Sequence, residues 1–241
     1  MSDMYTIPRS LNPASLGLWP PNDTEESVMG TDLHQLTIMN LRWGMNEIAA
    51  VLTPPGGPAP WQALSQTIVR GFPRRDGSLF KTLPAVFVYH HAIGRRRGSV
   101  SIDGDGPPAL IVEVLSESTY EVDIDLVEGK GYGYARAGVR EYLVLDPTGE
   151  FLPALGRAWR LSDDVYLPWA PAADGRWRSR EIAVDVGVED GTAAVYGRDG
   201  RRQLREGEIA NELARQENEL ARQENELAEL RRLVEELRGE R

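Results

Sequence analysis

The sequence predicts an α+β fold, close to the α/β type, in which a mixed β-sheet is flanked by helices and followed by a separate C-terminal helix. Short apolar runs bounded by Gly or Pro recur between residues 65 and 196, which is typical of strands. A stretch near the N-terminus places apolar residues at the 3.6-residue period of a helix. Residues 204–241 contain a seven-residue repeat, which is typical of a coiled coil.

The first helix is predicted over Thr31–Val51. Its apolar residues fall on one helical face, and Thr31 or Asp32 can act as the N-cap. The run Pro54-Pro55-Gly56-Gly57-Pro58 then ends the helix. Residues 1–24 are rich in Pro, Asn and Ser, and they are expected to form an extended arm.

The strands alternate with turn residues through the globular part. A further helix is predicted between Asp123 and Ala137, although its three glycines each cost roughly 1 kcal/mol against Ala. Gly138 ends this helix before the next strand. The predicted strands are Ser65–Arg70, Ala85–His90, Ala109–Leu115, Glu141–Leu145, Ala158–Leu161, Tyr166–Pro168, Ile182–Val186 and Thr192–Tyr196.

The C-terminal segment contains the heptad ARQENEL twice, at residues 214–220 and 221–227. This spacing predicts a coiled-coil seam with Leu at one core position and with Gln216 and Gln223 at the other. We therefore expect residues 204–241 to mediate self-association or to bind a helical protein partner. The alternative is a single amphipathic helix that docks on its own domain.

Composition sets the limits for the class of protein. The chain has 241 residues, of which 41% are apolar and 27% charged, as expected for one globular domain with an appendage. It has no cysteine, which excludes disulfides and thiolate chemistry and fits a cytoplasmic protein. The N-terminus lacks the pattern of a secretory signal, and no apolar run approaches the ~20 residues that span a bilayer. We therefore expect no membrane association. The net charge of −10 does not by itself predict nucleic-acid binding.

Glu113 is the strongest candidate for chemistry. It lies in the apolar run ALIVEVL, where a carboxylate is costly to bury unless a cation or a proton compensates it. Lys130 follows in the next helical segment. A buried strand glutamate with a nearby lysine is typical of metal-dependent nucleases, in which carboxylates hold Mg²⁺. The alternatives are an edge-strand glutamate that faces solvent and a solvated lysine.

The string PALIVEVLSEST, the lysine after it and the string YARAGVREYLVLDP resemble the signature of the Uma-two restriction endonuclease family. This family belongs to the PD-(D/E)XK nuclease superfamily. The resemblance extends over roughly residues 25–200, including Glu25-Glu26, His34-Gln35 and the strand that starts at Pro84. It implies a restriction-endonuclease-like sheet and a Mg²⁺- or Mn²⁺-dependent deoxyribonuclease with DNA as its partner.

The resemblance also implies roles for individual residues. Glu113 would be a metal ligand and Lys130 the displaced lysine of the motif, while Glu26 is a further candidate ligand. His34 and Tyr134 are additional site candidates.

The sequence departs from the family pattern at two positions. Strands that begin Pro-Asp in the family begin here as Pro84-Ala85 and Pro108-Ala109. Alanine offers no oxygen ligand, so the resemblance implies that Mg²⁺ binding is weak or absent and that cleavage is impaired. A natural loss of catalysis and a deliberate Asp→Ala replacement both fit these residues. Asp103 and Asp105 could compensate, although their Gly-rich context indicates a turn first.

Two hypotheses for function follow. The first is a metal-dependent DNA endonuclease that is impaired in this sequence. The second is a non-catalytic module that binds nucleic acid or protein and uses its coiled coil to assemble or to recruit a partner.

Overall fold

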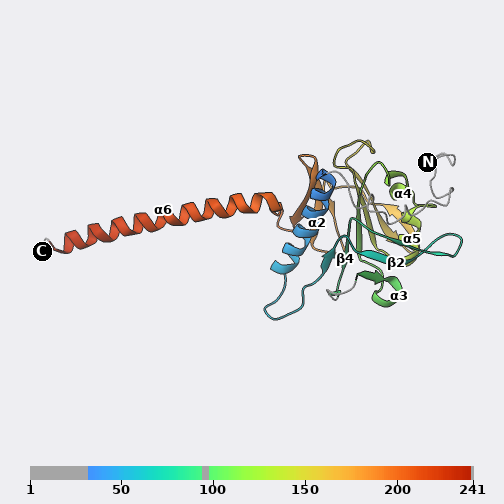
Figure 1. The fold of residues 1–241 in the computed structure, drawn as a ribbon, viewed down its shortest axis with the longest axis horizontal. Coiled ribbons are helices and arrows are strands. Elements are labelled where there is room, and N and C mark those ends of the chain that lie inside the picture. The colour runs from blue at the N-terminus through green and yellow to red at the C-terminus, as the bar shows by residue number, and fades with distance from the viewer. Residues whose placement is uncertain (1–31, 94–97, 240–241) are drawn as a thin grey trace. The chain divides into compact units, whose positions relative to one another are not determined.

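The computed structural model describes residues 32–93 and 98–239, and the remaining residues are drawn in grey in Figure 1. The expected arm at residues 1–24, Glu26 and the N-cap candidate Thr31 lie outside the described residues. The chain divides into two compact units, one that ends at Gln203 and one that begins at Leu204.

The first unit combines strands of mixed orientation with four of the described helices, which confirms the predicted α+β class. Its elements in chain order are α2 (Asp32–Val51), β1 (Gln62–Leu64), β2 (Ile68–Pro73), β3 (Leu79–Thr82), β4 (Val86–Tyr89), β5 (Ser99–Ser101), α3 (Ile102–Asp105), β6 (Leu110–Val114), α4 (Tyr120–Ile124), α5 (Lys130–Ala137), β7 (Glu141–Leu145), β8 (Gly156–Ser162), β9 (Val165–Pro168), β10 (Trp177–Arg178), β11 (Val184–Glu189) and β12 (Thr192–Gly197).

The central sheet has the strand order β1-β4-β6-β7-β8-β9. Strand β6 pairs antiparallel with β4 and parallel with β7. The parallel pair needs a crossover connection, and α4 and α5 supply it. Every residue of β4, β6 and β7 is buried, because both faces of the sheet are covered.

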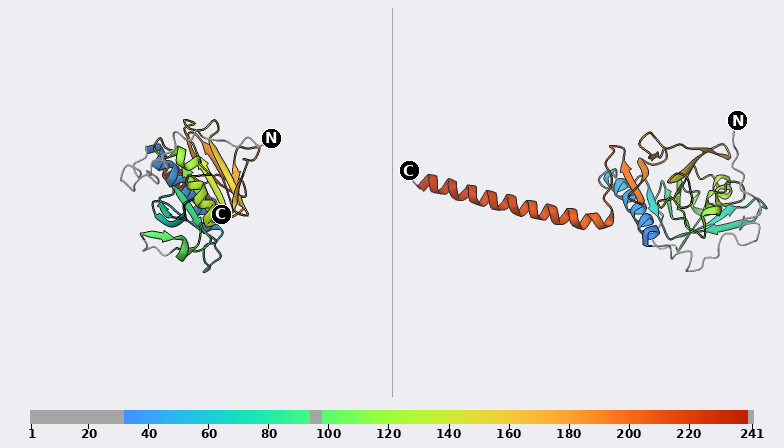
Figure 2. Two further views of the ribbon diagram at one scale, coloured as in Figure 1. Left: turned by 90° about the vertical axis from the view of Figure 1, so that its right-hand side faces the viewer. Right: turned by 90° about the horizontal axis from the view of Figure 1, so that it is seen from above.

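Alternate side chains of β6 enter two different cores, since successive strand residues point to opposite faces. Leu110 and Val112 pack with residues of α2 and of the three-stranded sheet β10-β11-β12. Ile111 packs on the other face, with residues of β2, α5 and β8. Figure 2 shows α2, drawn in blue, beside the C-terminal strands, drawn in orange. The face to which a side chain of β6 belongs therefore decides which core it meets.

Glycine determines how closely α5 packs. A Cβ atom on Gly133 would lie 2.3 Å from Cε1 of Phe80, far inside van der Waals contact. The helix predicted over Asp123–Ala137 is only partly correct, because it is interrupted. The chain forms α4, leaves the helix at Asp125 and starts α5 at Lys130. The glycines that weaken helix propensity here allow the close approach of α5 to β3.

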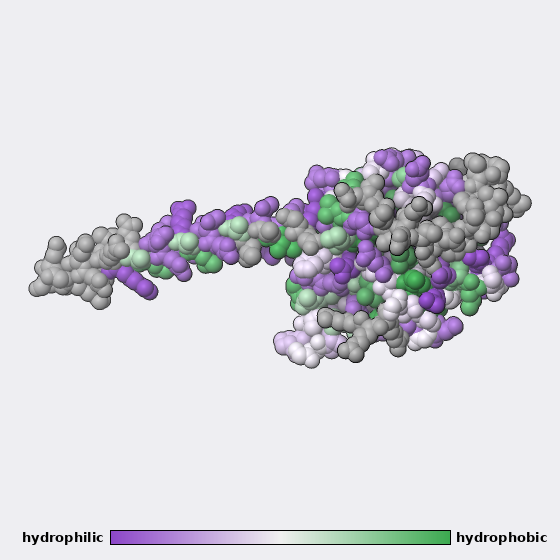
Figure 3. All heavy atoms as spheres, in the orientation of Figure 1, coloured by the Kyte–Doolittle hydropathy of each residue, from purple (hydrophilic) through white to green (hydrophobic). Residues whose placement is uncertain are grey.

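The second unit contains α6 (Glu206–Gly239), a single helix of 34 residues. In Figure 3 its described side chains are largely hydrophilic, with apolar ones between them. Leu220, Leu227 and Leu230 are 60%, 54% and 58% exposed. The helix is thus as predicted, while the coiled coil remains a prediction. Among the described residues no helix has the length and apolarity needed to cross a membrane.

Candidate active site

Glu113 lies near the end of β6, with 3% of its surface exposed. Its side chain is on the same face of the strand as Ile111. Oε1 accepts hydrogen bonds from Tyr134 Oη at 2.7 Å and from Lys130 Nζ at 3.2 Å. Oε2 accepts one from the backbone N–H of Ala85 at 3.0 Å. The structure therefore brings together four of the residues that the sequence predicts for the site.

Lys130 is the first residue of α5 and is also buried. Besides Glu113, its ammonium contacts Asp123 Oδ1 at 2.7 Å. Asp123 comes from α4 and is 1% exposed. Glu113, Asp123, Lys130 and Tyr134 thus form one buried cluster, called here the Glu113 cluster, in which one ammonium lies between two carboxylates.

Burial and neighbouring charge shift the pKa values in this cluster. Burial raises the pKa of Glu113, and Asp123 raises it further, against the opposing effects of Lys130 and of the two other hydrogen bonds. Burial alone would lower the pKa of Lys130, but the Asp123 and Glu113 carboxylates outweigh it and raise that pKa. The lysine is therefore protonated and positively charged at neutral pH. Burial also raises the pKa of Tyr134, which keeps its hydroxyl a hydrogen-bond donor.

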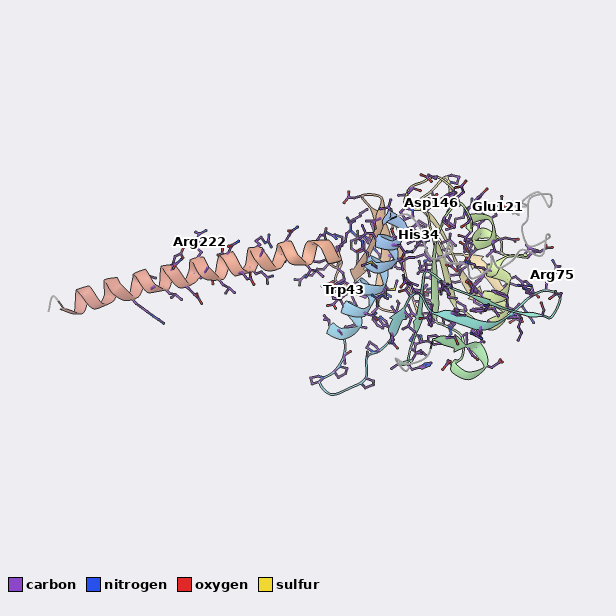
Figure 4. The ribbon with its side chains drawn as sticks, viewed as in Figure 1. His34, Trp43, Arg75, Glu121, Asp146 and Arg222 are labelled. Atoms are coloured by element: carbon purple, nitrogen blue, oxygen red, sulfur yellow. The ribbon has the colours of Figure 1, made fainter. Side chains whose placement is uncertain are left out.

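A small cavity of about 60 Å³ opens beside the cluster. Glu113, Asp123 and Lys130 line it together with Ala85 and with His34 from α2. Figure 4 labels His34 on that helix. Burial lowers the pKa of His34, so its imidazole is neutral near pH 7. The cavity is larger than the roughly 10–15 Å³ that one water molecule needs.

The two alanines that replace the expected aspartates precede two adjacent antiparallel strands, β4 and β6, and therefore lie at opposite ends of that strand pair. The β4–β6 register pairs Val86 with Val112, so one further step places Ala85 opposite Glu113. Ala109 precedes the start of β6, and its N–H donates to the carbonyl of Val88. Four residues of strand separate it from Glu113, about 13 Å. Ala85 therefore belongs to the site by position, whereas an aspartate at 109 could not share an ion with Glu113.

The side chains present do not fit a tightly held Mg²⁺. Within residues 32–93 and 98–239, no group of three or more His, Asp or Glu side chains is arranged to hold a metal ion. Mg²⁺ needs near-octahedral oxygen ligands, and both carboxylates of the Glu113 cluster already bind the Lys130 ammonium. Asp103 and Asp105 lie in the short helix α3 and do not line the cavity.

Asp123 is the site residue that sequence reasoning missed. It lies in the run YEVDIDL, where an acidic residue between Val122 and Ile124 looks like one of several solvated charges. The available signal was its position between two apolar residues that are themselves in the core or packed against it. That signal does not distinguish Asp123 from the neighbouring Asp125, whose side chain instead accepts a hydrogen bond from the backbone of Val127.

Part of the chain matches a protein-family model. No curated protein and no solved structure matches it significantly. The family match spans a shorter stretch than the predicted resemblance over roughly residues 25–200, and it does not include α2. It does include every member of the Glu113 cluster. Residues 70–153 match the Uma2 family, whose description is "putative restriction endonuclease", and this confirms the family resemblance predicted from the sequence.

Proposed function

We propose that the chain is a DNA-binding member of a metal-dependent nuclease family, whose cleavage of phosphodiesters is impaired in this sequence. The observation that carries the proposal is the Glu113 cluster itself. Glu113 and Lys130 are buried, in contact at 3.2 Å, and beside a cavity. A structural ion pair alone is weak evidence of stability, and perturbed pKa values in a cleft are typical of functional sites.

Lys130 is suited to act on a phosphodiester. Its ammonium is held cationic by Asp123 and Glu113, and a fixed cation in a poorly solvated site stabilises the negative charge that develops on a phosphate oxygen. A divalent metal, when bound in such a site, polarises the phosphate and lowers the pKa of a water. Position 85 is where this chain lacks a ligand, since an aspartate there would place its carboxylate in the same cavity as Glu113.

The test is restoration of one aspartate. Ala85→Asp should strengthen Mg²⁺ or Mn²⁺ binding at least about tenfold, because each carboxylate ligand strengthens a hard-cation site. Ala109→Asp is the matched control, with the same change of charge at the other end of the strand pair. Metal binding should raise the melting temperature of the Ala85→Asp protein by mass action. Calorimetric titration and thermal unfolding report these effects without any need for activity.

Cleavage is measured with supercoiled plasmid, single-stranded DNA and branched DNA in Mg²⁺ or Mn²⁺. We expect nicking by Ala85→Asp, little by the unaltered chain, and no gain from Ala109→Asp. If the Ala85→Asp protein binds metal but cuts none of these DNA forms, the nuclease proposal fails. Equal gains in nicking from Ala85→Asp and Ala109→Asp would also contradict the proposal, because they would show that a carboxylate beside Glu113 is not required.

The second candidate function is a non-catalytic module that assembles through α6. It is supported by the exposure of Leu220, Leu227 and Leu230 on a helix with a heptad pattern. A partner helix that packs against these leucines would remove their apolar surface from water. Deletion of residues 204–241 should lower the mass measured by light scattering.

A paired substitution tests the seam without deletion. Leu220→Gln with Leu227→Gln should dissociate the assembly, while Ala214→Gln with Ala221→Gln, on the outer face of the heptad, should leave the mass unchanged. A monomeric full-length chain would contradict self-association and leave a helical protein partner as the candidate.

A further inference from the structure

A second cavity, of about 310 Å³, lies in the first unit away from the Glu113 cluster. Four arginines line it: Arg160 of β8, Arg178 of β10, Arg180, and Arg198 after β12. The remaining lining residues include no Asp or Glu. The volume is at the lower end of the range for small-molecule sites. We call this feature the arginine pocket.

Arg160 is fixed in place from two sides. Its Nε donates to Glu141 Oε1 at 2.9 Å, and its guanidinium lies 4.1 Å from the centre of the Trp169 ring. Glu141 is 1% exposed and also accepts hydrogen bonds from Ser179 Oγ at 2.5 Å and from Arg180 N–H at 2.8 Å. One buried carboxylate thus orients both a guanidinium and the backbone of the adjacent wall, which makes the pocket pre-organised.

The wall of the pocket has an excess of positive charge. Arg178 and Arg198 share Asp185, at 3.4 Å and 3.1 Å, and Arg178 also contacts Asp174. Together with Glu141, which pairs with Arg160, three carboxylates contact three of the four lining guanidinium groups, which leaves an excess of one positive charge. The side chain of Arg180 is exposed, and within the part of the chain that the structure describes it makes no hydrogen bond or ion pair. Because four arginines and no carboxylate line the cavity, its wall is cationic.

The arginine pocket is separate from the Glu113 cluster. Glu141 pairs in register with Leu110, three residues before Glu113, which is about 10 Å along the strand. The side chains of Glu141 and Glu113 also lie on opposite faces of the sheet. Glu141 shares its face with Leu143 of one core, and Glu113 shares its face with Ile111 of the other. One phosphate therefore cannot contact both sites.

We propose that the arginine pocket binds a phosphate group, carried either by a free nucleotide or by a nucleic-acid backbone. Guanidinium groups recognise phosphate through paired hydrogen bonds, and several of them around one cavity match an anion with more than one charge. The alternative is that the arginines only join β8 to the β10–β12 sheet. That role accounts for Arg160 and Arg198 but gives no task to Arg180. The proposal does not depend on nuclease activity.

The experiment titrates the full-length chain in EDTA, at fixed ionic strength, by calorimetry and by fluorescence anisotropy. The probes are inorganic phosphate, pyrophosphate, a 5′-deoxymononucleotide, and single-stranded and duplex oligonucleotides. Arg180→Gln and Arg178→Gln should each weaken binding about tenfold or more, as the loss of a charge-assisted hydrogen bond predicts. Arg75→Gln is the matched control. Arg75 lies in the loop between β2 and β3 (Figure 4), and its replacement should change affinity less than about twofold.

Each outcome decides the proposal. Binding of nucleotide or pyrophosphate that depends on Arg180 supports a free phosphate ligand, and binding of oligonucleotide alone with the same dependence supports a backbone ligand. Lack of binding by every probe at millimolar concentration overturns the proposal. Equal weakening by Arg180→Gln and Arg75→Gln overturns it as well, because it would show attraction to net charge and not to a site. Circular dichroism confirms that each variant folds.

Discussion

Replacing Lys130 by Met removes the cation between two buried carboxylates. The ammonium lies 3.2 Å from Glu113 and 2.7 Å from Asp123, and all three side chains are at most 7% exposed. Met keeps most of the volume of the lysine but cannot compensate a charge. Because an uncompensated carboxylate in this position is costly, Glu113 should take up a proton in the folded state of the variant.

The cost depends on pH, and its size follows from the proton uptake. At pH 7 the solution is 2.5 pH units above the ordinary glutamate pKa of 4.5, and at ~1.36 kcal/mol per unit the uptake of one proton by Glu113 costs about 3 kcal/mol. This agrees with the roughly 3–5 kcal/mol lost on breaking buried pairs. At pH 5 the same reasoning gives less than about 1 kcal/mol. A raised pKa in the folded state means that stability falls as pH rises, so the variant should be least impaired at low pH.

Urea unfolding followed by tryptophan fluorescence measures this cost. All six tryptophans precede Leu204, so the signal reports on the first unit alone. Lys81→Met, at an exposed position of β3, is the matched control and should lose less than about 0.5 kcal/mol. A Lys130→Met protein as stable as this control at pH 7 would refute the reasoning. An equal loss at pH 5 and pH 7 would show that proton uptake does not set the cost.

Three further predictions concern the surroundings of the site. Gly133→Ala should lower the free energy of unfolding by more than about 2 kcal/mol, because its Cβ would overlap the Phe80 ring, and Gly98→Ala, with open space around it, is its control in the same urea titration. Tyr134→Phe removes a hydrogen bond to the buried glutamate and should cost about 1–2 kcal/mol at pH 7 but less at pH 5. Asp146→Ala should cost about 3 kcal/mol, since this buried carboxylate (Figure 4) accepts hydrogen bonds from three backbone N–H groups and a threonine hydroxyl. Its loss should appear as faster hydrogen exchange in residues 147–152, and unchanged exchange there would contradict this role.

The central part of the fold follows from the sequence because its signals are strong and local. The strand Glu141–Leu145 is predicted to the residue, and α2 differs from its prediction only at Thr31, which lies outside the described residues. Four short strands, β1, β3, β5 and β10, were missed, and β3 and β5 show why. They are four and three residues long and lie at the two edges of a small sheet around β2. Strand β5 pairs with β2 from about 30 residues away, and β3, joined to β2 by a short turn, alternates over only four residues, too few for a clear period.

The candidate site shows the same division. Glu113 and Lys130 could be found because a charge in an apolar run and a family motif both mark them. Asp123 could not be found, since its burial results from the way α4 turns back over the sheet. The difference between Ala85 and Ala109 was also hidden. In sequence the two Pro-Ala pairs look equivalent. Strands β4 and β6 are antiparallel, however, so the residues that precede them lie at opposite ends of the strand pair.

The lysine of the Glu113 cluster comes from the crossover between β6 and β7, and not from the strand that carries Glu113. In a glutamate-x-lysine arrangement the lysine would stand two residues after Glu113, where this chain has Leu115, a buried residue on the same face of the sheet. Leu115 and Lys130 thus mark two positions of the chain, one just after the strand and one on the helix, that lie on the Glu113 side of the sheet. Substitutions could move the lysine between them in two steps, through an intermediate sequence that carries both. A search for relatives that requires the lysine at one fixed spacing will therefore overlook chains that keep the charge in the same place.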